Sequence, residues 1–261
     1  MTRQVLTFPC EGQTLSATLD LPDGAPPNVG LFIVSGGTEI RSGAWSSNAR
    51  IAAAVAAAGF AAFRFDRRGV GDSEGANEGF RSAAPDIAAA LAAFRGAVPS
   101  ITRIVAHGNC DGASALMLAH GRDTDALVLS NPWTFEEENA GPSVKALREH
   151  YKRRLMSLAA VERLLTGKVS IVKLIQSLVK MTRPAPPPST LATQMAEGLA
   201  GYAGRVRLLV ATNDYTAQAF LGAWDAKDNR LAQCAGATHC FVEPHAREWL
   251  MAQILDEMRR V

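Results

Sequence analysis

The sequence predicts an α/β protein with one mainly parallel sheet of eight strands and helices on both faces. Three observations predict this class. Short apolar runs alternate with helical patterns along most of the 261 residues, and such alternation is typical of parallel strands joined by helices. The run Val29–Val34 is continuously apolar, as expected for a strand buried on both faces. The composition, 48% hydrophobic and 20% charged, is that of a globular domain.

The chain opens with two runs that alternate apolar and polar residues and predict an antiparallel pair, Gln4–Phe8 and Thr14–Leu21. Further runs predict strands at Val29–Val34, Phe60–Phe65, Arg103–Ala106, Ala126–Leu129, Val206–Ala211 and Leu231–Cys234. Helical patterns between them predict helices at Asn48–Ala58, Ala84–Phe94, Cys110–His120, Thr216–Trp224 and Ala246–Arg260.

The interval 134–204 interrupts this alternation. Apolar residues recur at helical spacing from Val144 to Met181, and the pattern ends at the proline-rich segment Pro184–Pro188. We therefore predict one core made of residues 1–133 and 205–261. Residues 134–204 would form a helical cap, or lid, inserted into that core.

The predicted cap is also the most basic part of the chain. Residues 142–183 contain ten Lys or Arg and two Glu, a net charge of +8, whereas the whole chain carries +2. Two interpretations stay open. The charge is either the solvated outer face of amphipathic helices, or it attracts an anionic substrate, polymer or membrane surface. The small overall charge excludes a strongly basic nucleic-acid-binding protein.

Other features of the sequence argue against further classes of protein, namely membrane-spanning, secreted, metal-binding and nucleotide-binding proteins. No apolar run reaches the roughly 18 residues of a membrane span, and the N-terminal residues lack the apolar core of a signal peptide. The four cysteines show no metal-ligand spacing, and neither a P-loop nor a dinucleotide-binding glycine pattern is present. We expect a cytoplasmic protein that needs no cofactor.

The segment 104–113, Ile-Val-Ala-His-Gly-Asn-Cys-Asp-Gly-Ala, carries the strongest chemical signal. A strand runs directly into a helix, and Gly108 and Gly112 flank Cys110 two residues away on either side. Glycine is needed there because strand and helix approach too closely for a Cβ. This is the nucleophile-elbow pattern with Cys in place of Ser. The helix N-terminus favours a thiolate at Cys110.

A thiolate nucleophile needs a base, and the base needs an orienting acid. Of the five histidines, His239 alone occupies a loop between the last strand and the last helix, at the carboxyl end of a strand. Asp214 ends another buried strand 25 residues earlier. Asp225 and Asp228 are rival acids, but they follow a helix. The resulting chain order, Cys110, Asp214, His239, is nucleophile, acid, base.

These features resemble the α/β-hydrolase superfamily, in which the triad follows this order. Ser35-Gly36-Gly37-Thr38 stands where that family places its oxyanion loop, with Ser35 in place of the usual His. The segment from Asp66 to Gly75 is similar to the family's Asp-x-Arg-Gly-x-Gly-x-Ser segment, and we interpret it as scaffold.

Two further features indicate a narrower group within this superfamily. They are Arg41, which lies four residues after Gly37, and the elbow with cysteine as its central residue. Together with the Asp66–Gly75 segment, these are similar to hydrolases associated with exosortase and exopolysaccharide gene clusters. Hydrolases of the dienelactone-hydrolase type also have a Cys nucleophile, so the cysteine alone does not define a subfamily.

The resemblance implies an enzyme that acts on an ester or thioester of a small acyl substrate through an acyl-Cys110 intermediate. His239 would transfer protons and Asp214 would orient the imidazole. Backbone N–H groups of Asp111 and of Gly37 or Thr38 would form the oxyanion hole. An acyltransferase with the same triad is the alternative. A non-catalytic ligand-binding protein is a third possibility, against which the complete triad argues.

Overall fold

The computed structural model describes residues 1–136 and 190–261. Eight strands form one sheet in the order β1-β2-β4-β3-β5-β6-β7-β8. β1 and β2 pair antiparallel, β2 pairs antiparallel with β4, and the neighbours from β4 to β8 are parallel. The strands are β1 (Thr2–Cys10), β2 (Gln13–Leu21), β3 (Val29–Val34), β4 (Ala61–Phe65), β5 (Arg103–Asn109), β6 (Ala126–Ser130), β7 (Arg205–Ala211) and β8 (Leu231–Cys234). The predicted fold class is confirmed.

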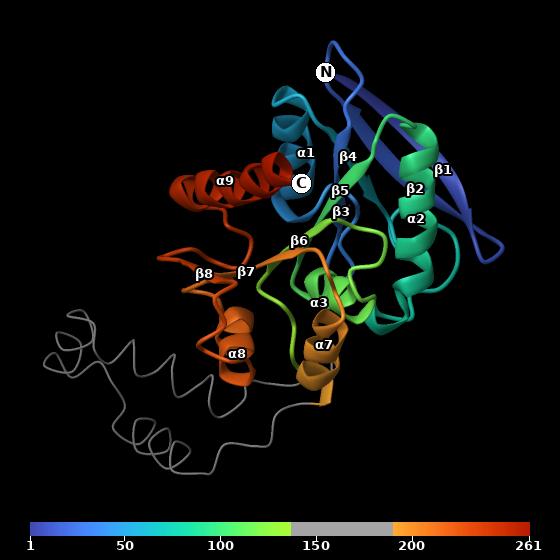
Figure 1. Ribbon diagram of the computed structural model, residues 1–261. Helices are drawn as coiled ribbons and strands as arrows, with labels where there is room; N and C mark the ends of the chain where they lie inside the picture. Colours follow the sequence, from blue (N-terminus) through green and yellow to red (C-terminus); the bar gives the residue numbers. More distant parts are fainter. Residues whose placement is uncertain (137–189) are drawn as a thin grey trace, which may run out of the picture.

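Helices cover both faces of the sheet (Figure 1). One face is covered by α1 (Ser47–Ala57) and α9 (Pro244–Arg260). The other face is covered by α2 (Ala84–Ala97), α3 (Asp111–Leu118), α7 (Thr190–Ala200) and α8 (Tyr215–Ala223). Two short 3-10 helices, η1 (Ala44–Ser46) and η2 (Phe80–Ser82), lie in the connections.

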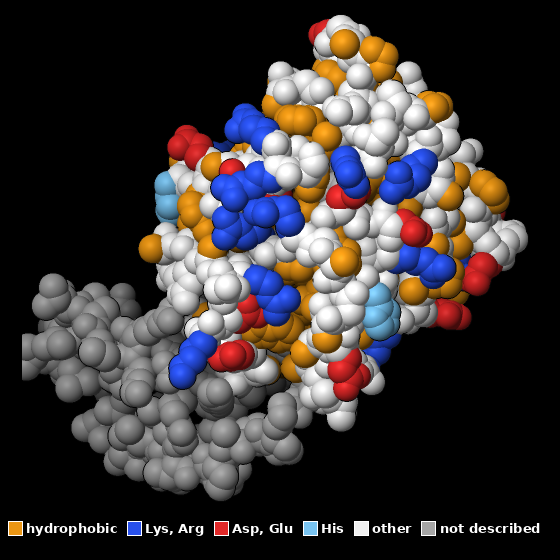
Figure 2. Space-filling view, in the orientation of Figure 1, with side chains coloured by type: hydrophobic (Ala, Val, Ile, Leu, Met, Phe, Trp, Pro, Cys, Tyr) orange, Lys and Arg blue, Asp and Glu red, His pale blue; other side chains and the backbone are white. Residues whose placement is uncertain are grey.

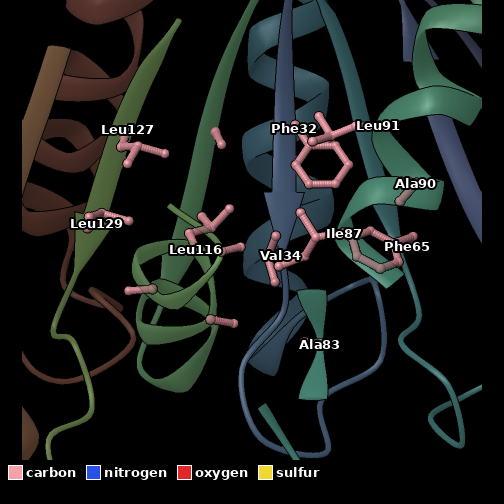
Figure 3. Packing of buried hydrophobic residues seen from close by; sticks show 14 of the residues in the cluster. Phe32, Val34, Phe65, Ala83, Ile87, Ala90, Leu91, Leu116, Leu127 and Leu129 are labelled. Carbon is pink, nitrogen blue, oxygen red and sulfur yellow. The ribbon is translucent and has the colours of Figure 1, made fainter. Parts of the chain in front are cut away.

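Strand β3 divides its side chains between two hydrophobic cores. Phe32 and Val34 join the core under α2 and α3, whereas Leu31 and Ile33 join the core under α1 and α9, because successive side chains of a strand alternate. All four are at most 1% exposed. Figure 3 shows Phe32 beside Leu91 of α2. This double burial explains why β3 is apolar at every position.

The expected helix Cys110–His120 is wrong at both ends. Cys110 has φ 58° and His120 has φ 58°, a left-handed conformation that cannot belong to an α-helix. The helix α3 is therefore limited to Asp111–Leu118. β5 continues to Asn109, beyond the expected Ala106, because His107 is itself buried in the sheet.

The predicted cap falls mostly outside the described residues, as do the basic segment and the proline-rich connector. Within the interval 134–204, the described helix α7 packs against α3. Leu191, Met195 and Leu199 of α7 are buried in the core that α3 shares. This end of the interval therefore contributes to the core. The limits of the cap stay a prediction.

The surface of the described residues mixes charges of both signs. Figure 2 shows basic and acidic side chains interspersed over the face that it displays, with hydrophobic side chains between them. Within residues 1–136 and 190–261, no helix has both the length and the apolar character needed to cross a membrane.

The contact between α7 and α3 gives a stability prediction. A Cβ at Gly198 would overlap the carbonyl oxygen of Met117, whereas a Cβ at Gly96 of α2 would have nothing within 4 Å. Gly198→Ala should therefore destabilise the protein by about 1–3 kcal/mol through overpacking. Gly96→Ala should stabilise it by up to ~1 kcal/mol, because alanine favours helix. Urea unfolding measures the change in the free energy of unfolding for both variants. Equal changes would contradict the close contact between Gly198 and Met117.

Candidate active site

Cys110 lies on a strained corner between β5 and α3. Its φ of 58° and ψ of −129° belong to a region that costs a non-glycine residue about 1–3 kcal/mol. A Cβ on Gly108 would lie 2.6 Å from the carbonyl carbon of Gly112, and one on Gly112 would lie 2.5 Å from the oxygen of Val34. The Cys110 N–H donates to the Ser130 carbonyl of β6 at 3.0 Å. The neighbouring strands therefore hold this corner in place.

The structure brings His239 between Cys110 and Asp214. Nδ1 of His239 lies 2.9 Å from Oδ2 of Asp214, and the imidazole also hydrogen-bonds Cys110. Burial opposes protonation of His239. The hydrogen bonds and negative charges of Asp214 and Cys110 outweigh that burial and raise its pKa to about 11. Asp214 is itself 7% exposed and accepts the N–H of Ala217 at 2.9 Å, which caps α8.

The two rival acids lie elsewhere. Asp228 pairs with Arg230 at 2.6 Å, and its hydrogen bonds to Arg230, with a further one from Trp224, lower its pKa to about 2 despite partial burial. Asp225 accepts the backbone N–H of Lys227 in an exposed turn. Among the described carboxylates, Asp214 is the one at hydrogen-bonding distance from His239.

His107 is a structural residue of the sheet. Its Nδ1 contacts the Val128 carbonyl at 2.9 Å, and burial lowers its pKa to about 4, so the ring is neutral at neutral pH. His245 lies in α9, where its Nε2 contacts the Ala235 carbonyl at 3.0 Å.

The loop after β3 lies directly against the elbow. A Cβ on Gly36 would be 3.4 Å from Cβ of Cys110 and 2.9 Å from Oδ1 of Asp111. The N–H of Gly37 donates to that Asp111 carboxylate, and the Gly37 carbonyl accepts from Arg67. Gly37 and Asp111 therefore lie together beside Cys110, and their role in an oxyanion hole stays a prediction. Thr38 follows in the same loop and is exposed.

The segment that begins at Asp66 holds this loop. Asp66 is fully buried and accepts from both the backbone N–H and the guanidinium of Arg41. Arg41 also pairs with Asp72 at 2.8 Å. Both Arg41 and Arg67 therefore tie the loop after β3 to the turn after β4. Sequence reasoning identified this segment as scaffold but missed these links.

Sequence reasoning also missed two asparagines that position His239. Asn109 and Asn131 both donate their side-chain N–H to the His239 carbonyl, at 3.3 and 2.9 Å. Asn131 is fully buried, has φ 44°, and accepts the N–H of Ala211 at 2.8 Å. In the sequence, Asn131 is followed by proline, which signals only the end of a strand.

An aromatic cluster borders the elbow. The rings of Trp133 and Phe135 are 4.5 Å apart, and Phe135 stacks on Tyr215 at 5.6 Å. The backbone N–H of Trp133 donates to the Cys110 carbonyl at 3.3 Å. Tyr215 directly follows Asp214 in the chain. The cluster therefore places apolar surface next to both the cysteine and the acid.

Residues 31–253 match the sequence pattern of the alpha/beta hydrolase family. Because the match covers most of the chain, the protein belongs to this family. The sequence-based identification of a hydrolase is thereby confirmed at the level of the family. A search of the curated proteins found no match.

Solved structures share the fold at low sequence identity. Est1E from Butyrivibrio proteoclasticus, solved with ferulic acid bound, is 17% identical with a TM-score of 0.62, covering 97% of this chain and 99% of its own. The esterase PF2001 of Pyrococcus furiosus is 14% identical with a TM-score of 0.64, covering 99% and 91%. XC6422 from Xanthomonas campestris, described as a serine hydrolase without a lid, is 15% identical with a TM-score of 0.63, covering 100% and 95%.

The raised pKa of His239 predicts how Cys110 reacts with iodoacetamide. The imidazolium charge is held across the neutral range and is lost only as the pH rises through about 11. At pH 7, alkylation of Cys110 should therefore be at least about tenfold slower in His239→Gln than in the wild type, because the neutral amide supplies no positive charge beside the sulfur. Peptide mapping by mass spectrometry measures the rates. Equal rates in the two proteins would contradict a role of the imidazolium in activating Cys110.

The two asparagines give a second prediction for the site. Asn131→Ala leaves the buried N–H of Ala211 without a partner and should cost about 1–3 kcal/mol of stability. It should also slow Cys110 alkylation at neutral pH, because His239 loses its fixed position. Asn213 is a matched control, since its side chain donates to Gly236 on the same loop but is exposed. Asn213→Ala should change neither value appreciably, and equal losses in both variants would argue against a positioning role.

Proposed function

We propose that the protein hydrolyses carboxylic esters or thioesters through an acyl-Cys110 intermediate. The observation that carries this proposal is the placement of His239 between the elbow cysteine and the buried carboxylate of Asp214. A protonated imidazole beside a cysteine favours the thiolate, which is the nucleophilic form. The helix N-terminus at Asp111 acts in the same direction.

In the acylation step, the Cys110 sulfur attacks the carbonyl carbon of the substrate. The carbonyl oxygen becomes an oxyanion, for which backbone N–H groups of Asp111 and of Gly37 or Thr38 are the proposed donors. One such donor contributes roughly 3 kcal/mol to transition-state stabilisation. When the tetrahedral intermediate collapses, His239 protonates the departing alcohol or thiol. Asp214 holds the imidazole in the required tautomer.

In the second step, the neutral His239 accepts a proton from water, and the resulting hydroxide attacks the acyl-cysteine carbonyl. The acid is released and the cysteine is regenerated. An alcohol, amine or thiol that replaces water would make the protein an acyltransferase instead. Partitioning of the acyl group between water and added hydroxylamine or alcohol distinguishes the two activities. A binding protein would form no acyl-enzyme at all.

The substrate is proposed only as a class. The aromatic cluster of Trp133, Phe135 and Tyr215 offers apolar surface for an acyl group, and the net charge of +8 over residues 142–183 favours an anionic substrate. A series of p-nitrophenyl esters of increasing chain length, with a succinyl ester and acyl-CoA thioesters beside it, would define the preference. We further propose a cytoplasmic location, since all four cysteines are free thiols, and retain the resemblance to exosortase-associated hydrolases as a hypothesis.

The triad predicts a specific pattern of losses with p-nitrophenyl acetate. Cys110→Ala should abolish turnover and the acetylated-protein mass, whereas Cys110→Ser should retain a little activity. His239→Ala should reduce kcat by several orders of magnitude and Asp214→Asn by less. Because triad members act as a unit, the double variant should be scarcely worse than His239→Ala. Stopped-flow and intact-mass measurements check this. Additive losses, or full activity after complete alkylation of Cys110, would refute the assignment.

A further inference from the structure

The Asp111 side chain occupies a position that the proposed mechanism needs. Its carboxylate accepts the N–H of Gly37, and the Gly37 carbonyl accepts from Arg67. Oδ2 of Asp111 lies 3.9 Å from Nη2 of Arg67, so the three residues form a closed ring. The two side chains are only 13% and 5% exposed. The two side chains are therefore largely shielded from water, which strengthens the interaction between them, whereas the backbone of Gly37 is exposed.

This arrangement conflicts with the chemistry proposed for Gly37. An N–H that donates to a carboxylate is not free to donate to an oxyanion. In addition, a negative carboxylate beside a developing negative oxygen opposes the charge that the site must stabilise. The carboxylate therefore has to leave Gly37 before that N–H can take part in acylation.

Arg67 offers the carboxylate a second position. Its Nη1 is buried and has no hydrogen-bond partner among the described residues. The 3.9 Å contact between Nη2 and Asp111 is an ion pair that is too long for a hydrogen bond. Rotation of the Asp111 side chain toward Arg67 would convert this contact into charge-assisted hydrogen bonds. Gly36, against which the carboxylate packs, has no Cβ to obstruct the movement.

We propose that Asp111 is a positioning residue with two states. Its carboxylate holds Gly37 N–H in the free protein and moves to Arg67 when an acyl carbonyl binds. The inference rests on the proposed function, because it assigns Gly37 to the oxyanion hole. Every acyl substrate must displace the same carboxylate, so the reduction in apparent affinity is the same factor for all of them.

The test compares Asp111→Ala and the isosteric Asp111→Asn with the wild type. In Asp111→Ala, kcat/KM should rise about tenfold, the value of one charged hydrogen bond, and by the same factor for p-nitrophenyl acetate and hexanoate. Asp111→Asn, whose neutral oxygen competes less strongly, should give a smaller rise. Inhibition by butyraldehyde, which forms a hemithioacetal with its oxygen in the hole, should strengthen by the same factor. Asp256→Asn, on the outer surface of α9, is the control and should change none of these values.

The outcomes separate the two proposals. An unchanged or lower kcat/KM in folded Asp111→Ala, with acetylated Cys110 still detected, would overturn the role of Asp111 and leave the proposed function standing. A rise that depends on acyl length would also overturn it, because it would indicate an enlarged acyl pocket. If neither the wild type nor any variant forms acetyl-Cys110, the proposed function fails, and the Asp111 inference fails with it. If Asp111→Ala does not fold, the same measurements of kcat/KM, of its dependence on acyl length and of acetyl-Cys110 are made on Asp111→Asn and judged in the same way.

Discussion

The geometry of the whole site depends on the close approach of β5 to α3. Because Gly108 and Gly112 carry no side chains, the helix begins directly above the end of the strand, and the backbone must turn within one residue. Cys110 makes that turn with a positive φ. The unfavourable conformation persists because β3 and β6 pair with β5 on both sides. A central, largely buried strand supplies the rigidity that a surface loop would lack.

Around this turn, the carboxyl edge of the sheet holds an unusual density of buried charge. Asp66 pairs with Arg41, Asp111 with Arg67, and Asp214 with His239. Removing one partner of a buried pair leaves an uncompensated charge, which is far more costly than the net stabilisation that the pair provides. The loop after β3 is tied into two of these pairs through its own backbone. The geometry of the proposed active site and the local stability therefore depend on the same side chains.

Much of the fold and of the candidate site was predictable from the sequence, for identifiable reasons. Strands such as Val29–Val34 are apolar because both faces are covered, and Asp214 stands out because it follows a strand whose end is buried in the same way. His239 stands out because it lies in the loop between the last strand and the last helix. The contacts of Asn131, Arg67 and the Asp111 side chain were not predictable, because they join segments distant in the chain. The helix after β5 was placed one residue early, because the elbow pattern indicates a strained turn at Cys110 but does not show that the helix begins only after it.

The hydrogen bond from Asn109 to the His239 carbonyl spans 130 positions of the chain. Contacts between such distant segments form late in folding, because a large loop must close before they stabilise anything. The elbow itself depends on β3, β5, β6 and α3, which lie closer to one another in the chain than Asn109 lies to His239. A partly folded chain can therefore possess its turn and its cysteine before the imidazole arrives with the edge strand β8. Under the proposed mechanism, the thiol then stays unactivated, and comparatively inert to electrophiles, until the sheet is complete. Chemical reactivity is a property of the finished fold.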